Sequence, residues 1–337
     1  MAPGEAPRVT VVPGGQAFRV DGAESILECA LRAGLAMAYG CSSGNCGECK
    51  ARVIEGRIRP LRAHDYRLTE AEKLQGYALM CCATALTDLV IEAAVAHGAA
   101  EMPHRTLLAH ARKLDRLSDE MMLLELVTPR ANRLRFLAGQ SAVLTLGGMT
   151  ATLPIASCPC EERRLHFHLR RIAGDPLSDH MSARLRIGEA VAVEGPVGDF
   201  VLREGGARRL AFIAWGWEGF PPVKSIIEHA LAQETAEAID LYWIAATAAD
   251  HYHSKLCRAW ADAMDPFRYT PVVAGVGLED AAAPAAAEAL RRALTGFGQL
   301  AQHDFYVAGP AAAVAASRDF LIGQGLPPDR LVTWTPA

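Results

Sequence analysis

Four cysteines have a spacing that suits a metal cluster. Cys41, Cys46 and Cys49 lie in one loop, and Cys81 follows after 31 further residues. This pattern, C-x4-C-x2-C…C, is a spacing that holds 2Fe–2S clusters. Two bridged irons need four thiolates, and a tight loop can present three of them while a distant cysteine completes the site. The sequence therefore predicts a 2Fe–2S cluster and, with it, one-electron transfer.

The loop also contains the residues that a cluster needs around its sulfurs. Gly40, Gly44 and Gly47 alternate with the cysteines. Glycine adopts positive φ without a steric penalty, so such a loop can turn its N–H groups toward the sulfur atoms. Those donors offset the negative charge of the cluster and tune its potential. A structural zinc site is the alternative, but it favours paired C-x2-C motifs, and only Cys46 and Cys49 form one here.

Other candidate ligands carry weaker signals. Cys82 adjoins Cys81, and either of them could close the site. The remaining cysteines have no partner at ligand spacing and are expected to be buried or incidental: Cys29, Cys158, Cys160 and Cys257. His251 and His253 stand two apart and do not share a helix face. His166 and His168 share a strand face and could bind a metal with a third ligand, but a solvated face is the preferred interpretation.

The length and composition of the chain limit the functions that these residues can have. The chain has 337 residues, enough for two domains or three small ones, and 51% are hydrophobic, enough for several cores. Its 38 acidic and 34 basic residues give a net charge of −4, a poor match to nucleic acid. Neither a transmembrane run nor a signal-peptide apolar region is found, so the expected compartment is the cytoplasm. There, cysteines indicate metal or redox chemistry rather than disulfides.

The first hundred residues are predicted to form a small β-rich unit around the cysteine loop. Pro13, Gly14 and Gly15 mark a hairpin, and Thr69 with Glu72 forms a capping box. The expected strands are 8–12, 16–20, 51–54 and 88–92, and the expected helices are 25–33 and one beginning at 69. Residues 96–103 have no periodicity and are interpreted as a linker.

Two further regions follow. Residues 105–202 show short strands with turn signals, such as alternating Leu165, Phe167 and Leu169, and favour a small antiparallel barrel. Strand and helix alternate in the remainder, which predicts a doubly wound parallel sheet. Its expected strands are 210–215, 239–246, 267–274, 304–308 and 331–334. Its expected helices are 222–233, 254–264, 283–294 and 312–323, with 281–287 as a thin Ala-rich helix.

The segment 39–56, together with GYALMCCATALTDLVIE from Gly76, resembles the ferredoxin domain of oxygenase reductases. The rest of the chain is similar to the flavin and nicotinamide domains of the ferredoxin–NADP reductase-like family. The resemblance implies an α+β ferredoxin-like (β-grasp) domain, an antiparallel β-barrel flavin-type domain and an α/β doubly wound nucleotide-type domain. The corresponding ranges are 1–98, a linker at 99–104, 105–204 and 205–337. A 2Fe–2S cluster, FAD and NAD(P)H are the implied cofactors.

The flavin motif of that family is altered in this sequence. Its R-x-Y-S pattern, followed by a small apolar run, aligns with residues 151–157. Ile155-Ala156-Ser157 keeps the end of the motif, and Ser157 is a candidate cofactor residue. The resemblance also makes Ser178 a candidate for the flavin pyrophosphate. The phosphate-binding Arg, the stacking Tyr, the Ser and an upstream Tyr are missing; their positions hold Ala151, Leu153, Pro154 and Ser141.

The nicotinamide motif is altered too. The family's G-G-T-G-I-A-P turn aligns with residues 216–222, where Gly216, Gly219 and Pro222 are kept. Trp217 and Glu218 bring an indole and an anion to a turn that should approach a phosphate. Near the end, Gly309 and Pro310 match a C-G-P turn in which Ala308 replaces the Cys. The candidate cofactor residues here are Gly216, Gly219, Gly309 and Pro310.

Three functions follow from these patterns. The main hypothesis is an electron-transfer protein on an oxygenase-reductase scaffold, with impaired flavin and nicotinamide sites. It would pass single electrons to a partner oxygenase or other redox protein. The alternative is a fully working NAD(P)H-dependent reductase with FAD and a 2Fe–2S cluster, in which the flavin splits a two-electron donor into single electrons. A scaffold or redox sensor without turnover is the third.

Overall fold

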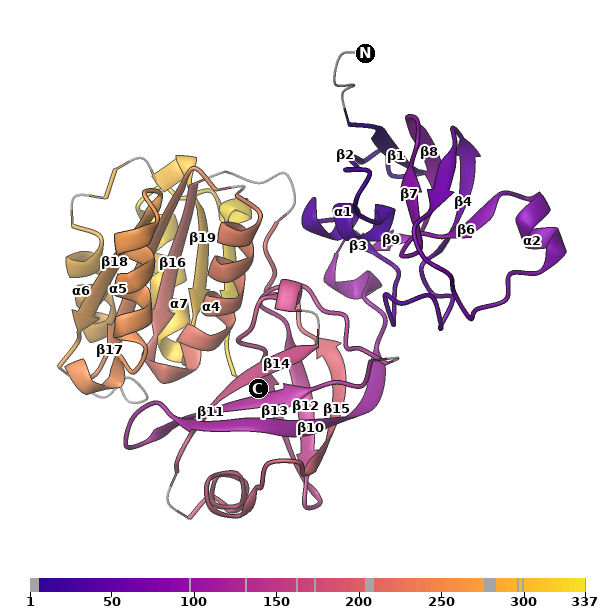
Figure 1. Cartoon of the computed structure of the whole chain (residues 1–337). Helices are drawn as coiled ribbons and strands as arrows, with labels where there is room; N and C mark the ends of the chain where they lie inside the picture. The colour runs from indigo at the N-terminus through magenta and orange to yellow at the C-terminus, as the bar shows by residue number, and fades with distance from the viewer. Residues whose placement is uncertain are drawn as a thin grey trace. The chain divides into compact units, whose positions relative to one another are not determined.

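The structure is a computed structural model that describes residues 6–96, 98–130, 132–161, 163–172, 174–203, 209–234, 236–275, 283–295, 297–298 and 300–336. It divides into two compact units (Figure 1). The first holds Met1–Pro103 and Thr128–Arg135, and the second holds His104–Val127 and Phe136–Ala337. The domain boundary predicted at residue 204 and the start of the Ala-rich helix at 281 lie outside the described residues. The three predicted domain ranges stay a prediction.

A five-stranded sheet forms the first unit, in the order β2-β1-β8-β4-β6. Strands β1 and β8 pair in parallel and the other neighbours are antiparallel. Helix α1 begins after Ser25, whose hydroxyl and Glu28 form a reciprocal capping box, and it buries Ile26 and Leu27 in the core of this unit. The bounds are β1 Arg8–Val12, β2 Ala17–Arg19, α1 Ile26–Arg32, β4 Lys50–Glu55, β6 Tyr77–Leu79 and β8 Leu89–Glu92.

Short elements complete this unit. Two two-stranded sheets pair β3 with β9 and β5 with β7. The capping box predicted at Thr69 and Glu72 is confirmed, and it opens helix α2. The bounds are β3 Ala36–Met37, β5 Ile58–Pro60, α2 Glu70–Leu74, β7 Ala83–Ala85, β9 Val95–Ala96 and the 3-10 helix η1 Ala99–Glu101.

The second unit begins with a six-stranded antiparallel sheet in the order β13-β12-β15-β10-β11-β14. The predicted barrel is therefore a curled, open sheet, since β13 and β14 are its edges. The strands are β10 Arg105–Arg116, β11 Met121–Val127, β12 Ser141–Leu146, β13 Met149–Pro154, β14 Arg164–Arg170 and β15 Ala190–Val197. Short helices lie between them: η2 Pro159–Glu161, α3 Pro176–Asp179 and the π-helix η3 His180–Arg184.

The predicted solvated face of β14 is wrong. His168 is 2% exposed and its ring lies 4.9 Å from that of His253, centroid to centroid. The His166 side chain is 16% exposed and lies beside Glu125. This face is covered because residues from a later helix and turn pack on it, a contact that alternation along one strand cannot reveal. Among the described residues, no group of His, Cys, Asp or Glu could hold a single metal ion.

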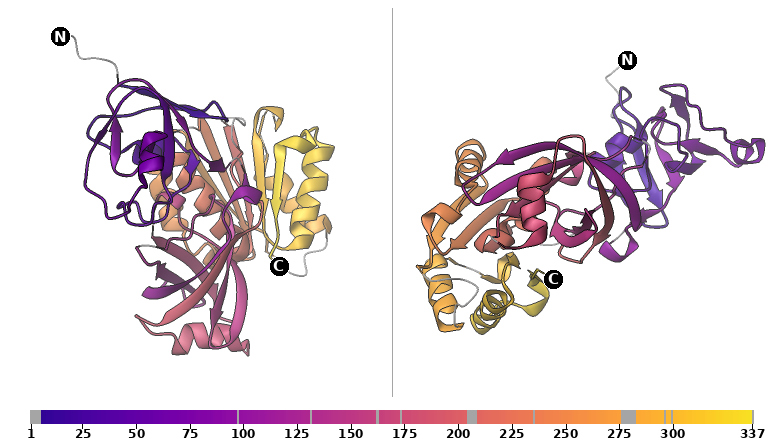
Figure 2. Two further views of the ribbon diagram at one scale, coloured as in Figure 1. Left: turned by 90° about the vertical axis from the view of Figure 1, so that its right-hand side faces the viewer. Right: turned by 90° about the horizontal axis from the view of Figure 1, so that it is seen from below.

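A parallel five-stranded sheet in the order β18-β17-β16-β19-β20 completes the second unit. Helices cover both of its faces: α4 and α5 pack on one core and α6 and α7 on the other (Figure 2). This is the predicted doubly wound arrangement. The bounds are β16 Arg209–Trp215, α4 Gly216–Ala232, β17 Ala238–Ala245, η4 Ala248–Asp250, α5 Ser254–Ala263, β18 Phe267–Val273, α6 Ala283–Ala293, η5 Leu300–Gln302, β19 Asp304–Ala308, α7 Ala311–Gly323, η6 Pro328–Arg330 and β20 Leu331–Trp334.

Helix α4 begins six residues before its predicted start. Pro221 and Pro222 lie inside it and lack the N–H groups that would normally bond back along the helix. Pro221 leaves the Trp217 carbonyl without its usual donor, and the Tyr252 hydroxyl donates to it at 3.3 Å; Trp243 Nε1 also donates to the Gly216 carbonyl, at 2.8 Å. These donors come from elsewhere in the fold, so the local sequence favours a later start.

Within the part of the chain that the structure describes, no helix combines the length and apolarity needed to span a bilayer.

Candidate functional site

The four predicted ligands come from two places in the first unit. Cys41, Cys46 and Cys49 lie in the loop between β3 and β4, and Cys81 lies between β6 and β7. The Sγ atoms of Cys49 and Cys81 are 3.1 Å apart, and both residues are buried. The fold therefore brings the distant cysteine to the loop, as the spacing predicts.

Backbone donors surround the loop sulfurs. The N–H groups of Ser43, Asn45 and Cys46 point at the Cys41 Sγ, with N···S distances of 3.4, 3.3 and 3.4 Å. The Cys41 N–H lies 3.3 Å from the Cys46 Sγ. An arrangement of this kind stabilises anionic sulfur.

Hydrogen bonds and burial also set the pKa values of these thiols. Burial raises the pKa of Cys41, but hydrogen bonds from Ser43 and the loop N–H groups outweigh it and lower the value to about 6. The pKa of Cys49 is lowered to about 7, chiefly by its hydrogen bond with Cys81. That same hydrogen bond raises the pKa of Cys81. Burial raises the pKa of Cys46, so within the loop thiolates are favoured at Cys41 and Cys49.

Two glycines are required by the close packing of this loop. Gly44 and Gly47 have φ of 85° and 80°. A Cβ on Gly44 would lie 2.7 Å from the Cys82 Sγ, and one on Gly47 would lie 2.2 Å from the Tyr66 ring. The loop thus folds around the sulfurs with no room for side chains at these positions. The residues present fit a 2Fe–2S cluster: the Cys49 and Cys81 sulfurs lie in contact, backbone donors face the Cys41 and Cys46 sulfurs, and the loop is tightly packed.

Cys82 lies beside the site as well. Its Sγ is 3.6 Å from that of Cys81, and it sits under Gly44. The contact between Cys49 and Cys81 supports Cys81 as the fourth ligand, and the assignment of the four ligands stays a prediction.

Two buried arginines near the loop were not predicted as site residues from the sequence. Arg133 donates to the Cys41 carbonyl at 3.1 Å, and Arg135 donates to the Ala36 carbonyl at 2.9 Å. The Arg135 guanidinium also lies 5.5 Å from the centre of the Tyr39 ring. Both belong to the segment 128–135, which joins the first unit although it follows β11 in the chain. An Arg-x-Arg pair within an apolar stretch was the available signal.

Removing the charge of Arg133 should make the cluster harder to reduce. Arg133→Met keeps the stem and deletes the guanidinium beside Cys41. Reduction adds an electron, so losing a nearby positive charge lowers the reduction potential. A potentiometric titration followed by EPR measures it. Arg52→Met, at an exposed arginine of the same unit, is the control and should leave the potential unchanged. An equal or higher potential in Arg133→Met would contradict this role.

The predicted flavin residues are occupied by contacts within the chain. The Ser157 hydroxyl donates to the Arg164 carbonyl at 3.0 Å and accepts from the His166 N–H at 3.2 Å. The Ser178 hydroxyl donates to the Arg170 carbonyl at 3.1 Å and accepts from the Ile172 N–H at 2.7 Å. Each serine therefore stabilises its own turn.

The aligned flavin motif on β13 has neither charge nor ring. Ala151 and Leu153 share one half-buried face of this strand, Pro154 is buried at its end, and Ser141 pairs with Pro154 across β12. These residues do not fit the phosphate and the ring system of a flavin in the way that the family motif does.

The predicted nicotinamide residues gather at one edge of the parallel sheet. Gly216 and Gly219 follow β16, and Gly309 and Pro310 follow β19, its neighbour. The strand order reverses between β16 and β19, and ligands of such sheets bind at this point. Gly219 has a packing role as well, because a Cβ there would lie 2.2 Å from the Ala308 carbonyl oxygen.

A buried aromatic and histidine cluster joins the curled sheet to α4. Phe220 stacks on Trp243 with centroids 3.9 Å apart, and His168 Nδ1 lies 2.9 Å from the Tyr252 hydroxyl. The Nε2 atoms of His168 and His253 are buried without a hydrogen-bond partner. Burial lowers the pKa of His168 well below its usual value and lowers that of His253 to about 4. Both imidazoles are neutral at neutral pH.

This cluster should make the second unit sensitive to acid. Below about pH 6.5 the unfolded chain binds a proton at His253, whereas the folded chain stays neutral there until about pH 4. The unfolded state then binds more protons, so stability is complete above pH 6.5 and falls as the pH drops. Between pH 7 and 5 this one histidine accounts for about 2 kcal/mol. In urea denaturation, the free energy of unfolding of His253→Gln should fall between pH 7 and pH 5 by about 2 kcal/mol less than that of the parent protein. An equal fall in the two proteins would contradict this prediction.

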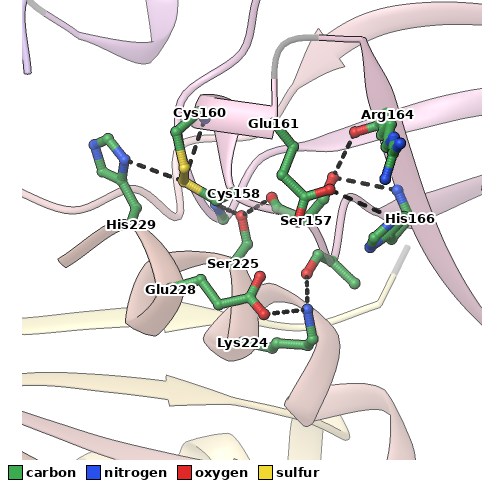
Figure 3. The surroundings of a disulfide bond; sticks show 12 residues. Ser157, Cys158, Cys160, Glu161, Arg164, His166, Lys224, Ser225, Glu228 and His229 are labelled. Carbon is green, nitrogen blue, oxygen red and sulfur yellow. Dashed lines mark hydrogen bonds and ion pairs between the residues drawn. A yellow bond between two sulfur atoms is a disulfide. The ribbon is translucent and has the colours of Figure 1, made fainter. Parts of the chain in front are cut away.

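One expectation about the cysteines is wrong. Cys158 and Cys160 are not incidental but form a disulfide across Pro159 (Figure 3). Cys29 and Cys257 are free and buried, as expected. The bond joins residues only two apart, and the spacing of metal ligands gives no sign of it.

Comparisons with known proteins identify the family. Residues 9–86 match the model of the 2Fe-2S iron-sulfur cluster binding domain. The reductase component of phenol 2-monooxygenase from Pseudomonas sp. (strain CF600) is 30% identical over 269 residues, 79% of this chain and 75% of that protein. The chain belongs to the oxygenase reductase family. A CDP-6-deoxy-L-threo-D-glycero-4-hexulose-3-dehydrase reductase from Yersinia pestis is 28% identical over 94% of each chain.

Solved structures agree with this family. A cytochrome P450 reductase from Amycolatopsis has a TM-score of 0.59 and 27% identity, and the match covers 98% of this chain and 99% of that one. A ferredoxin reductase in carbazole 1,9a-dioxygenase, 22% identical, has a TM-score of 0.58 and 98% coverage of both. The predicted fold class is thereby confirmed. The family implies a 2Fe–2S cluster, FAD and NAD(P)H as cofactors and a redox protein as partner.

Proposed function

We propose that this oxygenase reductase is the NAD(P)H-dependent component of an oxygenase-type system. In such a system a flavin accepts a hydride, and single electrons leave through a 2Fe–2S cluster. One observation carries the proposal: the match to a curated reductase extends over 94% of both chains, so it includes all three predicted domains. This favours the working reductase over the main sequence hypothesis of impaired sites.

The residues of this chain have separable tasks in that function. Cys41, Cys46, Cys49 and Cys81 would ligate the cluster, and the loop N–H groups would stabilise its charge. The turns after β16 and β19 would hold the dinucleotide at the switch point of the sheet. In this proposal the cluster residues lie in the loop and the nucleotide residues at the edge of the parallel sheet.

A second candidate is an electron carrier that receives its electrons from another protein. The altered positions favour it: Ala151, Leu153 and Pro154 offer neither charge nor ring, and Trp217 and Glu218 stand at the start of α4. Losing a charged hydrogen bond and an aromatic stack weakens flavin binding by about two to three powers of ten.

Rapid mixing distinguishes the two candidates. If the chain is a working reductase, stoichiometric NADH or NADPH should bleach the visible spectrum of the cluster within seconds, and acid extraction should release about one FAD per chain. A carrier would be reduced by dithionite only and release no flavin. Reduction by dithionite is the control for an intact cluster. The nucleotide that reduces the cluster faster is identified as the preferred electron donor.

The partner and the compartment complete the proposal. Curated relatives serve a phenol 2-monooxygenase, a terephthalate 1,2-dioxygenase and an aromatic O-demethylase, which points to an oxygenase as the acceptor. A dehydrase reductase among the relatives broadens the class to other redox enzymes. We place the protein in the cytoplasm, where thiolate ligands stay reduced.

A further inference from the structure

The two sulfurs of the Cys158–Cys160 disulfide differ in their surroundings (Figure 3). Cys158 is 3% exposed, whereas Cys160 is exposed. The Cys160 N–H donates to the Cys158 Sγ at 3.2 Å, and His229 Nδ1 lies 3.7 Å from the same sulfur. Burial lowers the pKa of His229, so this imidazole is neutral. The buried sulfur thus has groups that can stabilise a thiolate, and the outer sulfur is open to attack.

The exposed sulfur faces a charged pocket of about 580 Å³. Three arginines and two glutamates line it beside Cys160: Arg112, Arg163, Arg164, Glu125 and Glu161. Its size suits a small organic molecule. A ligand of that size in the pocket would therefore lie beside Cys160.

The pocket favours an anion. Its arginines exceed its glutamates by one charge. One carboxylate also lies beside a charged base, since Glu125 is 4.0 Å from Arg164. His166 lies 3.4 Å from Glu125 and 3.7 Å from Glu161, but burial lowers its pKa and the imidazole is neutral. Guanidinium groups bind carboxylates through paired hydrogen bonds. A ligand that carries carboxylates fits these walls better than a neutral one.

We propose that Cys158–Cys160 is a thiol–disulfide exchange site for an anionic low-molecular-weight thiol of the glutathione class. The arginines of the pocket hold the carboxylates of the thiol, and its sulfur attacks the Cys160 Sγ. This site is independent of the proposed electron transfer. A labile disulfide of this kind is also the form in which disulfides occur in a reducing compartment.

The exchange step balances without an external oxidant. The incoming thiolate forms an S–S bond to Cys160, the Cys158–Cys160 bond breaks, and its electron pair leaves on Cys158. The proton released by the incoming thiol ends on Cys158. The leaving sulfur is favoured at Cys158 because the Cys160 N–H already points at it.

Peptide mass spectrometry on the full-length protein tests the direction of attack. The protein is incubated with glutathione and quenched with N-ethylmaleimide. We expect glutathione on Cys160 and the maleimide on Cys158. Glutathione found on Cys158 alone would overturn the proposal. The absence of any glutathione adduct would overturn it as well, provided that a parallel sample treated with dithiothreitol shows that the disulfide can be opened. So would labelling of both cysteines before any thiol is added, because the disulfide would then be absent.

A charge test separates the pocket from simple exposure. Arg112→Gln and Arg164→Gln should each slow the reaction with glutathione roughly tenfold. Their rates with neutral 2-mercaptoethanol should stay within about twofold of the parent. Arg116→Gln is the matched control, since Arg116 lies on the same strand as Arg112 and pairs with Asp119 outside the pocket. Equal slowing with both thiols, or equal slowing in the control, would refute recognition of the anion. Urea denaturation of each variant reports whether the second unit, which holds these arginines, is folded.

Discussion

Cys46→Ala is expected to abolish the cluster, with complete loss of the visible absorption and of the EPR signal of the reduced protein. Its Sγ belongs to the loop in which N–H groups face sulfur, and no other described cysteine of that loop lies between Cys41 and Cys49. Cluster binding is part of the folding free energy of such a domain, so the first unit should also lose stability. Cys29→Ala is the matched control: it removes a buried thiol of the same unit outside the predicted ligand set and should retain a normal signal.

The fourth ligand is decided by a second pair of variants. Cys81→Ala should lose the cluster, and Cys82→Ala should keep it, because the Cys81 Sγ is the one beside Cys49. A normal rhombic signal in Cys81→Ala would instead make Cys82 the ligand.

Local patterns predicted the bounds of several strands and the start of one helix. Strands 8–12, 304–308 and 331–334 are confirmed at both ends. The predicted capping box at Thr69 starts α2; a second one, at Ser25, was not predicted and starts α1. Each of these signals acts over four or five residues, so a single sequence contains all of the information required.

The features that the sequence did not predict depend on contacts between segments that are far apart in the chain. His168 is buried because a distant turn covers its strand, and α4 starts early because Tyr252 donates from outside the helix to the carbonyl that Pro221 leaves unpaired. Arg133 reaches the cysteine loop from a segment 92 residues away. Such contacts are created by the fold, and no spacing within the local sequence encodes them.

Gly219→Ala is expected to destabilise the second unit by about 3 kcal/mol, the upper end of the usual cost of overpacking. The added Cβ would lie 2.2 Å from the Ala308 carbonyl oxygen and 2.8 Å from the Ala308 carbonyl carbon. Both atoms are backbone of a central strand and cannot rotate away. Helix α4 would have to move off β19, which would open the core around Phe220.

Urea denaturation of the purified protein measures this effect, with Gly323→Ala as the matched control. Gly323 also lies in a helix, but a Cβ there meets nothing within 4 Å, so alanine should be neutral or stabilise the protein by up to about 1 kcal/mol. A cofactor role alone would leave the ligand-free stability of Gly219→Ala unchanged. If Gly219 is needed for packing, the variant should be less stable than the parent protein even without nucleotide. The EPR signal of the cluster in the first unit should stay intact. Loss of stability in this variant would therefore explain why a glycine stands at 219 even if no dinucleotide binds there.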